Sequence, residues 1–136
     1  MQYFLAKTDP ETYSADDLAR DKSTIWDGVT NAQAVQTIRA MRTGDGVLIY
    51  HSQGEPAIVA LAKVKGEPRP DPSNAKSWVV EMQFVGKIDP TTTLAEIKTS
   101  GLFDDWALVR QGRLSTMSVP ASFVSWMRER YPALRL

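Results

Sequence analysis

The chain has 136 residues, of which 43% are hydrophobic and 24% charged, which is the balance of one folded domain and excludes disordered, collagen-like and coiled-coil chains. Sixteen Lys and Arg side chains balance sixteen Asp and Glu side chains, so nucleic-acid binding driven mainly by overall positive charge is disfavoured. With no cysteine and a single histidine, His51, a disulfide framework and the usual zinc sites are excluded.

No stretch approaches the roughly 20 apolar residues of a membrane span, and the N-terminus lacks the pattern of a signal peptide. We therefore expect a cytoplasmic protein with no membrane partner. The charge is uneven along the chain, because residues 110–136 carry five basic side chains and one acidic side chain. A local basic surface is therefore compatible with the neutral total.

The first third of the chain predicts one strand and two helices. Residues 2–6 are apolar and aromatic and lead into a turn at Pro10, which predicts a short strand inside the sheet. Ser14 and Asp17 have the spacing of a capping box and predict a brief helix. A second helix should begin at Thr30, capped by Thr30 and Gln33. Its apolar face comprises Ala34, Val35, Ile38 and Met41.

The middle of the chain predicts a hairpin and a further strand. Residues 47–52 and 57–64 are apolar and β-branched, and the turn residues 53–56 join them. Three prolines make residues 66–76 a predicted loop. Alternation then predicts a strand with one face on the core, formed by Trp78, Val80, Met82 and Phe84.

The last third predicts a short helix over 94–97 that ends near Gly101, an irregular segment over 103–112 and a strand over 114–119. Pro120 fits the first turn of a final helix that runs to Tyr131. Its apolar face comprises Phe123, Val124, Met127 and Tyr131. Strands interleaved with short helices predict a single α+β domain over residues 1–136, with a mixed or antiparallel sheet that is curved or closed into a barrel.

The segment from Trp26 to Asn31 is the first candidate site. Trp26 is suited to stacking on a flat ligand, and Gly28 lets the backbone approach such a ligand closely. The alternative is a buried core tryptophan, which is the commoner fate of a large aromatic residue. Asn31 either caps the following helix or, if Thr30 and Gln33 form the cap, reads the edge of a base.

Tyr50, His51 and Ser52 form a second candidate at a strand end. Alternation places His51 on the face opposite Tyr50 and Ser52, so a shared pocket requires the strand to end or bulge there. The alternative for His51 is a hydrogen-bonded structural residue.

Two further clusters are polar. The first comprises residues 7–9, Lys-Thr-Asp, which either contact a ligand at a sheet edge or form a solvated turn. A second polar cluster comprises Arg110, Arg113, Ser115 and Ser118. It either holds a phosphate or a base carbonyl, or it is an ordinary charged loop.

Five short motifs follow one another over essentially the whole chain. They are Lys7 to Pro10, Trp26 to Asn31 (Trp-x-Gly-Val-x-Asn), Met41 to Asp45 (Met-x-x-Gly-Asp), Tyr50 to Ser52 (Tyr-His-Ser) and Arg113 to Ser115 (Arg-Leu-Ser). In this order they resemble the EVE domain of the PUA-like superfamily, which also contains the YTH and ASCH domains.

The chain departs from the EVE pattern at three places. Thr8 and Asp9 stand where the family has Ser and Glu, and Thr116 and Ser118 stand where it has an apolar residue and a proline. The 66–76 loop is shorter than in the long-loop members, which affects one wall of the expected pocket.

The resemblance implies a PUA-like curved, mixed β-barrel with peripheral helices. It also implies a non-enzymatic reader that binds a flipped modified base in an aromatic pocket, of the 5-methylcytosine type in DNA or, less favoured, a modified base in RNA. No catalytic residue, cofactor or metal is expected, and a protein partner stays unknown.

The resemblance assigns the ligand to one set of residues, with Trp26 stacking on the base, Asn31 and Ser52 bonding its edge and Tyr50 lining the pocket. The full set is Lys7, Thr8, Trp26, Gly28, Val29, Asn31, Tyr50, His51, Ser52, Arg113, Leu114 and Ser115. Flanking phosphates would contact Lys7, Arg110 and Arg113.

Two alternatives come from other functional classes. One is a small ASCH-like amidohydrolase acting on a modified nucleoside, in which Lys7, Thr8 and Asp9 act as base and nucleophile. The other is a protein-interaction module that binds its partner through an apolar cleft.

Overall fold

The computed structural model describes residues 1–134 and residue 136. The strands are β1 (Tyr3–Thr8), β2 (Ser23–Trp26), β3 (Gly46–His51), β4 (Ala57–Val64), β5 (Arg69–Asp71), β6 (Asn74–Thr93) and β7 (Thr116–Ser118). The helices are α1 (Ala15–Asp21), α2 (Ala32–Ala40), α3 (Leu94–Ser100), α4 (Ala107–Arg110) and α5 (Ala121–Arg130).

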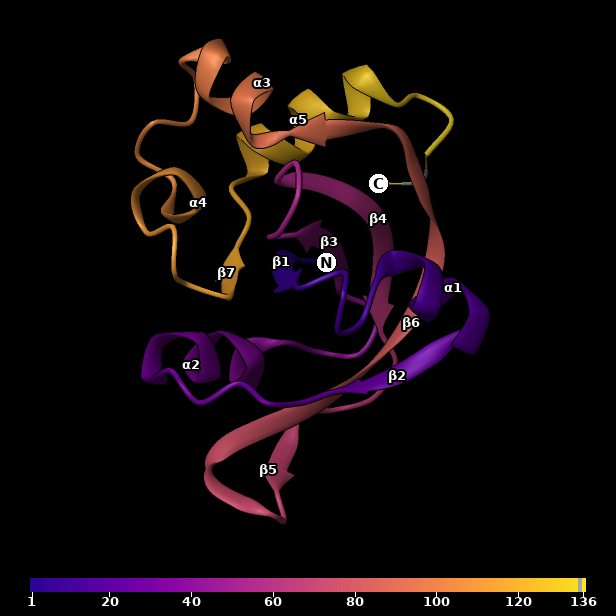
Figure 1. The fold of residues 1–136 in the computed structure, drawn as a ribbon, viewed down its shortest axis with the longest axis vertical. Helices are drawn as coiled ribbons and strands as arrows, with labels where there is room; N and C mark the ends of the chain where they lie inside the picture. Colours follow the sequence, from indigo (N-terminus) through magenta and orange to yellow (C-terminus); the bar gives the residue numbers. More distant parts are fainter. Residues whose placement is uncertain (135) are drawn as a thin grey trace.

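The strands form one curved, mixed sheet in the order β2-β6-β4-β3-β1-β7, and β5 pairs with β6. β1 and β3 run parallel, and the other neighbours run antiparallel. Figure 1 shows α3 and α5 at one end of this sheet and α2 at the other. Within the described residues β2 and β7 do not pair, so the sheet curves like a barrel but stays open. The predicted α+β class, with a curved, mixed sheet and peripheral helices, is confirmed.

The hydrophobic core lies inside the curve of the sheet. Leu5 of β1 pairs with Leu48 of β3 on one side and with Met117 of β7 on the other, and all three side chains are buried. Burying each such side chain stabilises the fold by about 1.5–3 kcal/mol. The predicted apolar faces of α2 and α5 are buried as well, which closes the core at both ends.

Several local signals are confirmed. Ser14 and Asp17 form the predicted capping box of α1, and Gly101 ends α3 with a φ of 68°, in the left-handed region that favours glycine. Residues 53–56 connect β3 and β4 as a hairpin. Among the described residues no helix combines the length and the apolar character that a membrane span needs.

The first third of the chain contains one strand that the sequence did not predict. Residues 23–26 form β2, which pairs with β6 so that Trp26 lies opposite Val80. The sequence predicted only one strand in this third of the chain, because Ser23 and Thr24 give this short edge strand little apolar signal. Of the two caps that the sequence allowed for α2, Asn31 is the one that forms: its Oδ1 accepts the Ala34 N–H at 3.1 Å.

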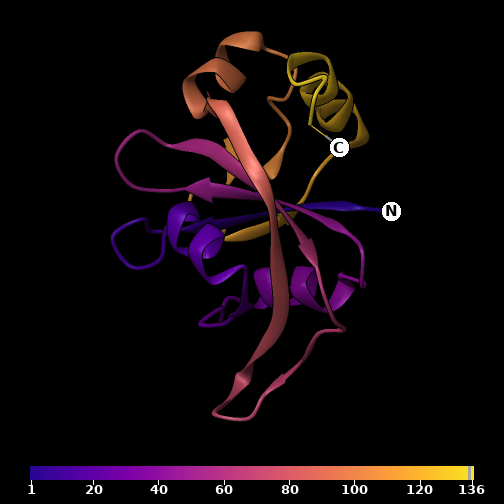
Figure 2. The same cartoon turned by 90° about the vertical axis from the view of Figure 1, so that its right-hand side faces the viewer.

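Two segments predicted as irregular also contain regular structure. Within residues 66–76, β5 and the start of β6 form a hairpin that projects from the body of the protein (Figure 2). Pro70 is tolerated because β5 is an edge strand, where a missing N–H donor costs little. Within residues 103–112, the short helix α4 begins after Trp106.

Gly46 should be intolerant of a side chain, because a Cβ at this position would overlap the ring of Tyr3 on the neighbouring strand. We expect Gly46→Ala to lower the free energy of unfolding by about 1–3 kcal/mol, measured by chemical denaturation. Gly66→Ala is the matched control, since a Cβ at Gly66 meets nothing within 4 Å. Equal stabilities of the two variants would contradict this account of the packing.

Candidate functional site

A pocket of about 470 Å³ opens between the end of β1 and the segment that follows β2. We call it the Trp26 pocket. Six of the residues predicted to bind a ligand line it: Lys7, Thr8, Trp26, Gly28, Val29 and Ser115. The volume lies within the range of small-molecule pockets, about 300–1,000 Å³.

Trp26 is both a core residue and a wall of this pocket. Its side chain is 8% exposed, and its ring meets that of Tyr13 edge to face, with centroids 6.5 Å apart. The chain then turns at Gly28, which has a φ of 77° and open space where a Cβ would stand. Pairing with β6 holds the strand that carries Trp26. The missing side chain of Gly28 leaves space at the edge of the pocket for a ligand to approach.

Lys7 supplies a positive charge to the lining of the same pocket. Its Nζ donates to the Gly112 carbonyl at 2.9 Å and lies 5.4 Å from the centroid of the Tyr50 ring. Burial lowers the pKa of Lys7 below its ordinary value. Within the described residues no carboxylate pairs with this ammonium group. Its remaining N–H donors are therefore available to an acceptor in the pocket.

Hydroxyl and backbone groups hold the end of β1 in place. Thr8 Oγ1 donates to the Tyr13 carbonyl at 2.7 Å, and Ser52 Oγ donates to the Thr8 carbonyl at 3.3 Å. The backbone N–H of Lys7 donates to the Ser115 carbonyl at 2.8 Å. These contacts tie three separate segments into one wall.

The side chains of residues 7–9 make separate hydrogen bonds to the backbone. The Asp9 carboxylate accepts the Glu11 N–H at 2.9 Å, while Lys7 and Thr8 each donate to a different backbone carbonyl. In the described part of the chain no hydrogen bond joins Lys7 to Thr8 or Asp9. In this structure Lys7 and Thr8 are thus engaged with separate backbone carbonyls.

Tyr50 and His51 face different sides of β3. Tyr50 is buried beneath Lys7, and this burial raises the pKa of the Tyr50 hydroxyl. His51 Nε2 accepts the Ala15 N–H at 3.0 Å and holds the start of α1. The register shift beside Tyr50 places the extra residue, Val59, on β4, so β3 stays regular against β1. His51 is thus a hydrogen-bonded structural residue and does not line the Trp26 pocket.

Tyr50 and Ser52 do not line the pocket, contrary to the prediction, and four more predicted site residues also lie outside its lining. Asn31 is exposed at the N-cap of α2, and Leu114 is buried in the core. Arg110 pairs with Asp105 at 2.9 Å, whereas Arg113 is exposed on the loop before β7. Of the four, Arg113 is the cation that stands nearest in sequence to the pocket residue Ser115.

The sequence prediction missed Tyr13, whose ring completes the pocket beside Trp26. Its hydroxyl donates to the Asp21 carboxylate at 2.9 Å. The available signal was an aromatic residue directly before the capping residue Ser14. Within residues 1–134 and 136, no three His, Asp or Glu side chains gather as a metal site would require.

Comparison with known proteins places this fold among relatives. The sequence profile described as "EVE domain" matches residues 2–130. Thymocyte nuclear protein 1 of Rattus norvegicus is 34% identical, with 71% of this chain and 55% of that protein covered. The Homo sapiens protein of the same name is 31% identical, with 96% of this chain and 76% of that protein covered. The chain thus spans about half the length of the rat relative.

A solved structure shares the fold. The crystal structure of human THYN1 in complex with DNA that contains 5-methylcytosine has a TM-score of 0.85 and 26% identity, and the match covers 93% of this chain and 95% of that one.

Acidification should destabilise the protein through His51. Burial lowers the pKa of His51 below its ordinary value of 6.5, although the nearby Asp16 carboxylate partly opposes this shift. The unfolded chain therefore binds a proton at a higher pH than the folded protein does. The contribution of His51 to the free energy of unfolding is fully present above pH 6.5, and it is lost as the pH falls through the pKa that His51 has in the folded protein.

We expect the free energy of unfolding to decline below pH 6.5, with a slope that corresponds to the uptake of up to about one proton per molecule on unfolding. His51→Gln keeps a possible acceptor for the Ala15 N–H and should flatten the profile. Denaturant titrations at several pH values measure both chains. An identical decline in the two would contradict the assignment to His51.

Proposed function

The chain belongs to the EVE domain family, and on that premise we propose that it is a non-enzymatic reader of modified bases. A flipped base of the 5-methylcytosine type from DNA would bind in the Trp26 pocket. The observation that carries this proposal is that one pocket is lined both by an indole and by an ammonium group that pairs with no carboxylate among the described residues. The human relative solved with 5-methylcytosine DNA supports the choice of ligand.

The energetics suit a pocket of this kind. Taking a base out of a DNA stack costs a few kcal/mol. Stacking on one aromatic side chain returns about 1–3 kcal/mol, and the ring of Trp26 is already fixed by β6 before the ligand arrives. Lys7 and Ser115 would bond the base edge. The Asn31 side-chain oxygen caps α2 and the residue lies outside the pocket lining, so we assign it no contact with the base edge.

The proposed binding of a flipped base needs few contacts to the DNA phosphates. Arg113 is exposed two residues from Ser115 and would hold a phosphate beside the flipped base. Arg110 would contribute less, because it already pairs with Asp105. Lys7 lines the Trp26 pocket, so we propose that it contacts the base itself.

Binding to matched duplexes that carry cytosine or one 5-methylcytosine tests the proposal by fluorescence polarisation. We expect the wild-type protein to prefer the modified duplex. Trp26→Leu should weaken binding to it by about tenfold, which corresponds to about 1.4 kcal/mol of lost stacking. Trp126→Leu is the matched control: it removes a half-buried tryptophan of α5 outside the pocket and should leave the preference unchanged.

Equal, weak binding of the wild-type protein to both duplexes, or an unchanged preference in folded Trp26→Leu, would contradict the proposal. RNA oligonucleotides in the same assay decide between the two polymers. Release of product from an acylated nucleoside by the wild-type protein but not by Lys7→Ala would favour the hydrolase instead.

A further inference from the structure

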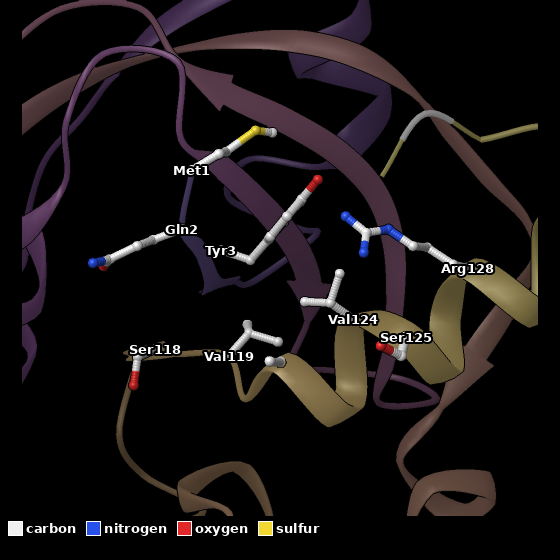
Figure 3. A pocket seen from close by; sticks show the side chains of 9 residues that line it. Met1, Gln2, Tyr3, Ser118, Val119, Val124, Ser125 and Arg128 are labelled. Carbon is white, nitrogen blue, oxygen red and sulfur yellow. The ribbon is translucent and has the colours of Figure 1, made fainter.

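A second pocket, of about 320 Å³, lies at the other end of β1, between the start of this strand and α5 (Figure 3). Its lining includes Tyr3, Val119, Val124, Ser125 and Arg128. Lys7 lies four positions after Tyr3 along β1, which at about 3.3 Å per residue is about 13 Å. The two pockets share no lining residue, so this α5 pocket is distinct from the Trp26 pocket.

The Tyr3 hydroxyl has no partner in this part of the fold. The ring lies against Gly46, where a Cβ would overlap it, so its position is fixed. The residue is 8% exposed, and within the described residues no group lies within hydrogen-bonding distance of the buried hydroxyl. Buried polar groups in folded proteins are nearly always paired. An unpaired donor held this firmly is suited to an acceptor on a ligand.

Arg128 brings a positive charge to the same place. In Figure 3 the Arg128 side chain extends from α5 toward Tyr3, with its guanidinium group on the side of the ring where the Tyr3 hydroxyl lies. The Nε donates to the Leu136 carbonyl at 3.0 Å, which leaves the two terminal nitrogens for another acceptor. Among the described residues no Asp or Glu pairs with Arg128 or lines the pocket.

These donors fit one class of ligand. A planar carboxylate has two oxygens, which match the guanidinium nitrogens and the single hydroxyl. A phosphate has more oxygens and charge than these donors satisfy. Val119 and Val124 add an apolar wall for the remainder of the molecule. We propose that the α5 pocket binds a small organic carboxylate, with its oxygens between Tyr3 and Arg128. This proposal does not depend on the function of the Trp26 pocket.

Benzoate is the probe, and benzamide is its neutral control of the same shape. In a titration followed by two-dimensional amide NMR, benzoate should give saturable shifts at Tyr3, Ser125 and Arg128. It should bind about tenfold more tightly than benzamide, because a charge-assisted hydrogen bond is about twice as strong as a neutral one.

Two variants separate binding from stability. Arg128→Gln should weaken benzoate binding by about tenfold or more. Tyr3→Phe should weaken it by about fivefold without lowering the melting temperature, because the hydroxyl has no partner to lose. Tyr131→Phe is the matched control: it removes a hydroxyl bonded to Thr92 and to the Pro90 carbonyl. It should lower the melting temperature and leave benzoate binding unchanged.

The proposal is overturned if benzoate gives no saturable shifts, if it binds no better than benzamide, or if its affinity is the same in Tyr3→Phe and Arg128→Gln as in the wild type. Shifts centred on Trp26 would place the site elsewhere. Inorganic phosphate that binds more tightly than benzoate would exclude the carboxylate class. A lower melting temperature of Tyr3→Phe would show that the hydroxyl is paired in the folded protein.

Discussion

The fold depends on β1 being hydrogen-bonded along both edges. It runs parallel to β3 and antiparallel to β7, so the six residues from Tyr3 to Thr8 are fixed by strands far away in sequence. The pairing continues past its end, where the Lys7 N–H bonds the Ser115 carbonyl and the Ser52 N–H bonds the Thr8 carbonyl. One rigid strand therefore delivers Lys7 to the Trp26 pocket and Tyr3 to the α5 pocket.

The other wall of the Trp26 pocket depends on an edge strand. β2 pairs only with β6 in the described part of the sheet, and this pairing holds Trp26 while the chain beyond it turns away at Gly28. The arrangement explains how a residue can be almost fully buried and still offer a face to a ligand. The pocket is lined both by residues of β2 and by Ser115, which directly precedes β7, and these two strands do not pair in the described part of the sheet.

Strong local patterns made much of the fold predictable. The capping box at Ser14, the 3.6-residue period of α2 and the hairpin at residues 53–56 each follow from nearby residues alone. β2 was missed because its register comes from β6, some 55 residues away. For the same reason Tyr13 could not be placed beside Trp26, and alternation alone left open whether His51 faced the pocket. The cap of α2 shows the limit of motif spacing, since Asn31 and Thr30 are equally suited by type.

The central claim is that a modified base leaves the DNA stack and enters the Trp26 pocket. A crystal structure of this protein with a duplex that carries one 5-methylcytosine tests it most directly. The account predicts the modified base outside the helix, in van der Waals contact with the Trp26 ring at about 4 Å, with its edge toward Lys7 and Ser115. A 5-methylcytosine still stacked in the duplex, with the DNA bound to another surface, would contradict it.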